Sequence, residues 1–121
     1  MTSVKFEPAI PVLRIYDIEK AKEFFIGFLG FTIDWEHRYE PDFPLYMQIS
    51  MCGLKLHLSE HYGDGTPGAV VYIRGTNIAD YARELHNKKA RFARPAPDDT
   101  RPEITDPFGN RLRFDDASNH V

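Results

Sequence analysis

The string GLKLHLSE at residues 53–60 decides the fold, because the chain repeats its pattern as GNRLRFDD at residues 109–116. Each string begins with glycine and then places a basic residue, a leucine, a second basic residue, an apolar residue and an acidic end at matching positions. Such alternation after a turn glycine is typical of a β-strand. His57 and Arg113 occupy the same place in the two copies, so we predict that both face the same kind of space.

A second repeated pattern precedes these two strings. An apolar strand pattern runs into Asp17 in the first half and into Asn77 in the second, and each is followed by Ile and a helical pattern. The shared order predicts an internal duplication within one domain that spans the chain. We expect module 1 at about 8–60, a glycine- and proline-rich linker at about 61–68, and module 2 at about 69–116.

The composition is that of a compact domain. The chain has 121 residues, of which 42% are hydrophobic and 13% aromatic, so it can bury a real core. Its formal net charge of −3 does not favour nucleic acid as a partner, and no long apolar run favours a membrane. Cys52 is the only cysteine, which excludes an internal disulfide and favours a reducing, cytoplasmic location.

Hydrophobic periodicity predicts the elements of module 1. A strand over 9–16 leads to a helix that begins at Ile18 and ends at Gly30, then to a strand over 31–39 and a hairpin of 45–51 and 54–58 around Cys52-Gly53. In the strand over 31–39, alternation places Phe31, Ile33 and Trp35 on one side.

Module 2 is predicted to repeat this plan. We expect a strand over 69–74, a helix over about 78–88 capped by Thr76 or Asn77, a short strand at Phe92, a strand over 103–105 and a last strand over 111–115. Neither module can bury the apolar face of its own helix alone, so the two are expected to pack into one α+β unit.

Several of these motifs together resemble the vicinal oxygen chelate superfamily, which includes glyoxalase I, extradiol dioxygenases and bleomycin resistance proteins. They are AIPVLRIYD at 9–17, the FF pair at 24–25, LGF at 29–31 and DPFGN at 106–110. VYIRG at 71–75 is most similar to the bleomycin resistance branch. The resemblance implies two βαβββ modules whose curved mixed sheets surround a cavity. It also implies a homodimer that exchanges its N-terminal strand.

The resemblance also bears on metal binding. In metal-dependent members each module supplies a ligand from its first strand and one from its last, and the matching positions here are Ile10, His57, Val70 and Arg113. Two aliphatic side chains and a guanidinium do not bind a divalent metal, which needs several His or carboxylate ligands. We therefore predict a protein with no metal, no cofactor and no catalytic residue, more a binding protein than an enzyme.

The string HLSEH at 57–61 matches the inverted zinc-protease motif, which requires a helix to bring its two histidines together. The alternation here instead predicts a strand that runs into a glycine-rich turn. On a strand the two histidines lie too far apart to share one ion. We interpret His57 as a residue of the cavity wall.

The resulting hypothesis is a metal-free homodimer that, like bleomycin resistance proteins, sequesters an aromatic or cationic drug-like ligand, such as a bleomycin-like compound. Aromatic side chains concentrate within residues 31–46, interleaved with acidic ones, which suits such ligands. The predicted ligand contacts are Trp35, Phe43, Tyr46, His57, Tyr72 and Arg113. The alternatives are a metal-dependent glyoxalase-like lyase or extradiol-type dioxygenase, and a sensor or structural module with an empty cavity.

Overall fold

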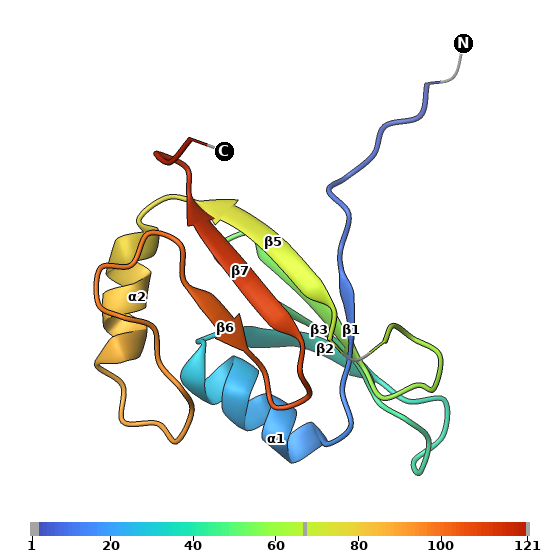
Figure 1. Cartoon of the computed structure of the whole chain (residues 1–121). Coiled ribbons are helices and arrows are strands. Elements are labelled where there is room, and N and C mark those ends of the chain that lie inside the picture. The colour runs from blue at the N-terminus through green and yellow to red at the C-terminus, as the bar shows by residue number, and fades with distance from the viewer. Residues whose placement is uncertain (1–2, 67, 121) are drawn as a thin grey trace.

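The computed structural model describes residues 3–66 and 68–120, so Pro67 of the expected linker lies outside the described residues. Module 1 contains β1 (Val12–Arg14), α1 (Ile18–Lys22), the π-helical η1 (Glu23–Phe28), β2 (Thr32–His37), β3 (Tyr46–Met51) and β4 (Leu54–Ser59) (Figure 1). Module 2 contains β5 (Val70–Gly75), α2 (Ile78–His86), β6 (Glu103–Thr105) and β7 (Arg111–Asp116). The predicted mixed α+β class is confirmed.

Two mixed sheets show the expected duplication. The first has the strand order β1-β4-β3-β2 and the second the order β5-β7-β6, and in each the first strand of the module runs parallel to its last. Val12 lies opposite His57 in the first sheet, and Tyr72 lies opposite Arg113 in the second. His57 and Arg113 therefore occupy equivalent positions in the two modules.

The predicted short strand at Phe92 is wrong. No strand lies between α2 and β6 in the described residues, so the second sheet has three strands where the first has four. Phe92 instead sits in a loop, with its ring edge-on to Phe24 at 5.1 Å and tilted against Phe28 at 5.5 Å. This isolated apolar residue fills the core and adds nothing to a sheet.

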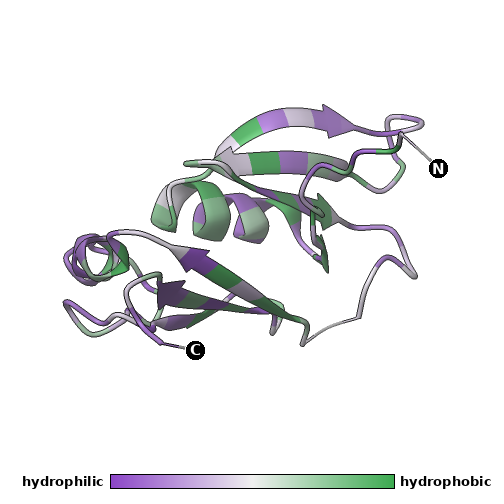
Figure 2. Ribbon diagram, turned by 90° about the horizontal axis from the view of Figure 1, so that it is seen from above, coloured by the Kyte–Doolittle hydropathy of each residue, from purple (hydrophilic) through white to green (hydrophobic). Residues whose placement is uncertain are grey.

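The helical segment of module 1 lies between the two sheets, as the view from above shows (Figure 2). One apolar core contains Phe24, Phe25 and Phe28 of this segment together with inward residues of both sheets. Among the sheet residues are Leu13, Met47, Ile49, Leu56, Leu58, Ile104, Leu112 and Phe114. The opposite face of each sheet consequently points outward, away from the other sheet. None of the helices in the described part of the chain is long and apolar enough to cross a membrane.

The first helix begins as predicted and then departs from α-helical geometry. The Asp17 carboxylate accepts a hydrogen bond from the Lys20 amide at 3.0 Å and caps the N-terminus. From Glu23 the segment widens into a π-helix, in which the Leu29 amide donates to the Phe24 carbonyl at 2.9 Å. The wider turn brings three phenylalanines toward the core, and Gly30, at φ +96°, ends the segment.

Strand β2 contains a bulge that overturns the predicted alternation. Ile33 pairs with Ile49 and Trp35 pairs with Gln48, so Asp34 between them has no position of its own in the ladder. Ile49 and Gln48 are neighbours in β3 and point to opposite faces of the sheet, so their partners Ile33 and Trp35 also point to opposite faces. The prediction that these two residues share one side is therefore wrong, and the bulge directs Trp35 to the outward face.

The outer strand β1 is shorter than the predicted strand over 9–16, since it covers only Val12–Arg14. Pro11 has no amide hydrogen for a ladder, but its carbonyl accepts a hydrogen bond from the His57 amide at 2.9 Å. At the other end of β4, the hairpin turn holds Cys52 at φ 51° and Gly53 at φ 90°. Two positive φ angles are the requirement of the type I′ turn that suits the twist of a hairpin.

The cap of α2 comes from a distant residue. Asn77 makes no side-chain cap, and the Ile78 amide instead donates to the carboxylate of Asp116, at the end of β7, at 3.1 Å. Of the two predicted positions, Thr76 and Asn77, the N-cap is Asn77, but the expected capping bond from its side chain is absent, and α2 depends on β7 for its N-terminus.

Replacing Asp116 by alanine is expected to lower the melting temperature by a few degrees, because the first turn of α2 then loses its acceptor. Amide hydrogen exchange should quicken in the first turn of α2 more than in α1, which keeps the Asp17 cap. Asn77→Gly serves as the control, since Asn77 offers no such bond and glycine adopts its left-handed backbone (φ 59°) without strain. A larger effect of Asn77→Gly than of Asp116→Ala would contradict this assignment of the cap.

The DPFGN turn at 106–110 ties the modules together. The Asp106 carboxylate accepts hydrogen bonds from the Phe108 amide at 2.9 Å and the Asn110 amide at 2.8 Å, which holds the turn. The Asn110 side chain donates to the Arg14 carbonyl of β1 at 3.0 Å. The turn therefore has a structural role, because it links the last hairpin of module 2 to the first strand of module 1.

Candidate functional site

The outward face of the first sheet carries a cluster of rings. The Trp35 and Tyr46 rings stack with centroids 6.0 Å apart and an angle of 11° between their planes. The His57 ring lies edge-on to both, at 5.3 Å from Trp35 and 5.1 Å from Tyr46. Trp35 is 43% exposed, so the cluster presents a flat aromatic surface to solvent. Three of the six predicted ligand contacts therefore meet.

A chain of hydrogen bonds orients the His57 ring. The Gln48 amide nitrogen donates to Asp34 at 2.9 Å, which directs the Gln48 oxygen to Nε2 of His57 at 3.0 Å. Because an amide oxygen only accepts, Nε2 carries the hydrogen and Nδ1 is left as an acceptor for the Tyr46 hydroxyl at 2.7 Å. Both ring nitrogens of His57 are therefore engaged within the protein.

The electrostatics of this cluster favour a neutral aromatic wall beside one carboxylate. Burial lowers the pKa of His57 and raises the pKa of Tyr46, so both rings are uncharged at neutral pH. Hydrogen bonds from Gln48 and Ser50 lower the pKa of Asp34, which stays ionised. The arrangement suits stacking by a planar ligand and does not provide a free general base.

Replacing Tyr46 by phenylalanine is expected to raise the pKa of His57. The hydroxyl bond to Nδ1 exists only while Nδ1 is unprotonated, so it stabilises neutral imidazole, and its loss favours the charged form. An NMR titration of the His57 ring signals measures this shift, with His86, which lies far along the chain on α2, as the internal reference. An unchanged or lower pKa of His57 would show that Tyr46 does not donate to it.

Further rings lie beside this cluster; Tyr39 belongs to the aromatic stretch 31–46 expected from the sequence, whereas His37 was missed. The Tyr46 ring is 6.3 Å from that of His61, which is 6.1 Å from Tyr39, and Tyr39 contacts His37 at 4.8 Å. These residues extend the aromatic surface past the ends of β2 and β4. His61 was noted in the sequence only as part of the HLSEH metal motif. His37 had no signal of its own, because the pairing of β2 with β3 is what places it opposite Tyr46.

Phe43 lies apart from these rings. It sits in the loop between β2 and β3, where its carbonyl accepts a hydrogen bond from Nε of Arg38 at 3.1 Å. Its side chain lines a separate surface hollow of about 420 Å³ with Ile18 and Glu60, among others. The structure therefore does not bring Phe43 together with Trp35.

Tyr72 and Arg113 lie on the outward face of the second sheet, and they are cross-strand neighbours. The Tyr72 hydroxyl donates to Asp115 at 2.5 Å, and Nη2 of Arg113 bonds to Glu103 at 3.1 Å. Since the helical layer separates the two sheets, these residues do not meet the Trp35 cluster within one chain (Figure 2).

The residues at the family's metal-ligand positions do not fit a divalent metal. Ile10 and Val70 are aliphatic, Arg113 is a cation, and both nitrogens of His57 are already bonded to Tyr46 and Gln48. Among the described residues, no group of three or more His, Cys, Asp or Glu side chains is arranged to hold a metal ion. The chemistry of this donor set gives no basis for a metal-dependent step.

Two mixed sheets, each built from a strand–helix–strand module and together enclosing a helix, define the class of fold. The chain belongs to the glyoxalase superfamily: the family described as "Glyoxalase superfamily protein" matches residues 1–120. This confirms the resemblance to the vicinal oxygen chelate superfamily. No match was found among curated proteins.

Solved structures of drug-binding proteins share this fold. A bleomycin-binding protein complexed with bleomycin is 21% identical, with 90% of this chain and 97% of that chain covered and a TM-score of 0.65. A bleomycin resistance determinant encoded on the transposon Tn5 is 20% identical, with coverages of 94% and 100% and a TM-score of 0.67. TnmS3, an antibiotic binding protein from Streptomyces sp. CB03234, is 15% identical, with coverages of 98% and 100% and a TM-score of 0.63.

Proposed function

We propose that this protein is a homodimeric small-molecule-binding protein that sequesters an aromatic or cationic drug-like ligand without metal chemistry. The observation that carries the proposal is the exposed stack of Trp35 and Tyr46 against His57. Flat rings on a rigid sheet bind planar rings by stacking and cations by cation–π contact, and Asp34 adds a negative charge nearby. The solved structures of bleomycin-binding and antibiotic-binding proteins with this fold support it.

A second copy of the chain completes the proposed site. The outward faces of the two sheets lie on opposite sides of the helical layer, so a ligand on one chain meets only one wall. In the dimer, the first sheet of one copy would face the second sheet of the other. The N-terminal arm before β1 leads away from the body of the molecule (Figure 1), and its Phe6 is 92% exposed. We propose that this arm is exchanged between the copies.

The proposed mechanism is capture. The ligand stacks on Trp35 and Tyr46, is removed from water by the second copy, and is held away from its target with no bond made or broken, as in antibiotic resistance by sequestration. His57 holds the Tyr46 hydroxyl in place and stays neutral. Modules at about 8–60 and 69–116 would each supply half of a site, and the single exposed Cys52 suits the reducing cytoplasm.

The test is a titration of the purified protein with metal-free bleomycin and, separately, with the neutral aromatic N-phenyl-1-naphthylamine. Quenching or enhancement of Trp35 fluorescence that saturates near one ligand per chain, with sedimentation as a dimer and recovery of the ligand unaltered, is the expected result. Saturation by the naphthylamine alone would reject bleomycin as the ligand and keep the proposed class. No saturation by either compound in calorimetry, or chemical conversion of the bound ligand, would overturn the proposal.

A further inference from the structure

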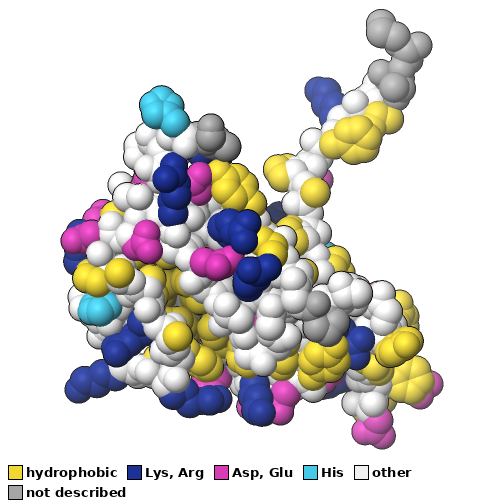
Figure 3. Space-filling view, viewed as in Figure 1, with side chains coloured by type: hydrophobic (Ala, Val, Ile, Leu, Met, Phe, Trp, Pro, Cys, Tyr) yellow, Lys and Arg dark blue, Asp and Glu magenta, His cyan; other side chains and the backbone are white. Residues whose placement is uncertain are grey.

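The outward face of the second sheet holds a hollow lined by two arginines and two carboxylates. It has a volume of about 430 Å³, and its lining includes Tyr72, Arg101, Glu103, Arg113, Asp115 and His120. Figure 3 faces this sheet and shows Lys and Arg side chains over β5 and β7, interleaved with Asp and Glu side chains. Among the described residues, two carboxylates take part in the ion pairs of this face: Asp115 pairs with Arg74 and Arg101, and Glu103 pairs with Arg111 and Arg113. Over this face, four arginines share two carboxylates in these ion pairs, whereas the lining of the hollow itself holds two arginines and two carboxylates.

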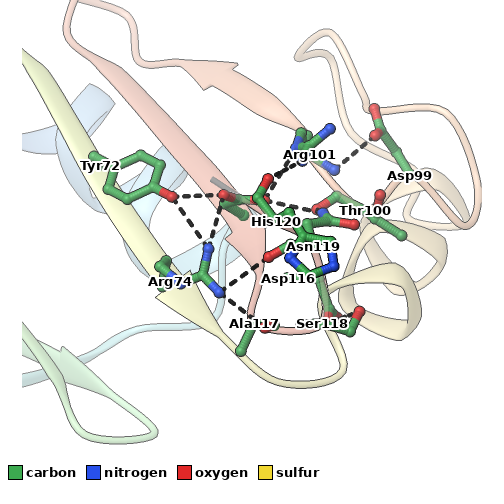
Figure 4. A network of polar contacts seen from close by, with 11 residues as sticks. Tyr72, Arg74, Asp99, Thr100, Arg101, Asp116, Ala117, Ser118, Asn119 and His120 are labelled. Atoms are coloured by element: carbon green, nitrogen blue, oxygen red, sulfur yellow. Dashed lines mark hydrogen bonds and ion pairs between the residues drawn. The ribbon is translucent and has the colours of Figure 1, made fainter.

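The carboxylate at its floor is already fully engaged. Asp115 is 5% exposed and accepts hydrogen bonds from the Tyr72 hydroxyl at 2.5 Å, from Nε of Arg101 at 3.2 Å and from Nδ2 of Asn119 at 2.9 Å. Arg74 adds a fourth contact at 3.2 Å (Figure 4). The bond from Tyr72, followed by those from Asn119 and Arg101, lowers the pKa of Asp115 to about 2. This charge is neutralised within the protein and does not attract a cationic ligand.

The two arginines that line the hollow keep free donors. Arg101 uses Nε for Asp115 and Nη2 for the His120 carbonyl, while Arg113 uses Nε and Nη2 for one oxygen of Glu103. Nη1 of each has no partner within residues 3–66 and 68–120, and the side chains are 58% and 49% exposed. An exposed ion pair such as Arg113–Glu103 is weak, so Arg113 can turn to a ligand at little cost. Guanidinium groups bind carboxylate, sulfonate and phosphate oxygens well.

We propose that this hollow binds an acidic group, and that the ligand is an aromatic compound carrying a carboxylate, sulfonate or phosphate. The ring would stack on the Trp35–Tyr46 wall, and the acidic group would bind Arg101 and Arg113 of the second copy. That one ligand carries both the ring and the acidic group rests on the proposed function. The binding of an anion in the hollow does not depend on that function. The proposal narrows the ligand class, because a purely cationic drug would not use the free guanidinium donors of Arg101 and Arg113.

A matched pair of probes tests the ligand class. 8-Anilinonaphthalene-1-sulfonate and N-phenyl-1-naphthylamine share their rings and differ by the sulfonate. The sulfonate is expected to bind about tenfold more tightly, and Arg101→Gln or Arg113→Gln should each weaken it about tenfold without changing binding of the neutral amine. Arg91→Gln is the control, since it makes the same charge change at an exposed residue that pairs with Glu23. Arg113→Lys should recover only part of the loss.

A titration with inorganic sulfate at constant ionic strength tests the hollow alone. We expect saturable NMR shifts at the side-chain Nε–H signals of Arg101 and Arg113 and none at Arg91. Absence of these shifts, or equal binding of both probes that Arg101→Gln and Arg113→Gln leave unchanged, overturns the inference and leaves the proposed function standing. Sulfate shifts without binding of either probe would support the anion site and count against the proposed function.

Discussion

Replacing Phe24 by alanine is expected to lower the free energy of unfolding by about 3–5 kcal/mol, as in other truncations of buried aromatic residues. Phe24 is fully buried in η1, between the two sheets. Its ring contacts Phe25 at 5.0 Å, Phe28 at 5.9 Å and Phe92 at 5.1 Å. The cavity would open where the modules share their core.

Urea unfolding followed by circular dichroism measures this change. The control is Tyr62→Ala, because Tyr62 is 96% exposed and its removal should change stability by no more than about 0.5 kcal/mol. If Phe24→Ala lowers the free energy of unfolding by less than about 1 kcal/mol, Phe24 behaves as a surface residue does. That result would mean that the two sheets do not depend on one shared core. Retention of cooperative unfolding is expected, since the variant removes packing and no hydrogen bond.

Elements of this fold were predictable where a turn residue and an alternating pattern agree within a few residues. The strings that begin at Gly53 and Gly109 became β4 and β7, with His57 and Arg113 in equivalent registers. The bulge at Asp34 was not predictable, because alternation in the sequence continues across it and only the pairing with β3 reveals it. The Asp116 cap of α2 was missed for a similar reason, since it joins residues far apart in the chain.

The candidate site was predictable in part. Trp35, Tyr46 and His57 come from three strands that follow one another and pair as neighbours, so local patterns bring them to one face. The separation of Tyr72 and Arg113 from that face follows from how the modules pack around the helical layer, which no local pattern encodes. The free donors of Arg101 depend on Asp115 and His120, and neither residue had a sequence signal that marked it for a site.

The largest effect on binding is expected from Trp35→Ala, which should weaken N-phenyl-1-naphthylamine by about 30- to 100-fold. Trp35 is the outer ring of the stack with Tyr46, and truncating a central aromatic contact commonly costs about 2–3 kcal/mol of binding free energy. Trp35→Phe keeps a flat ring on the same strand and should retain most of the affinity. Because N-phenyl-1-naphthylamine has no acidic group, its affinity does not depend on the hollow lined by Arg101 and Arg113.

Because Trp35 is the only tryptophan, binding to Trp35→Ala must be followed by the fluorescence of the probe and by calorimetry. Tyr62→Ala again serves as the control, since it removes an exposed ring that lies outside the stack. Equal weakening by Trp35→Ala and Tyr62→Ala would indicate non-specific adsorption to exposed rings. Unchanged affinity in Trp35→Ala would place the ligand elsewhere and remove the observation on which sequestration rests. A selective loss in Trp35→Ala, with the melting temperature retained, would assign the ring-binding wall to the bulged strand β2, where the extra residue Asp34 turns Trp35 outward.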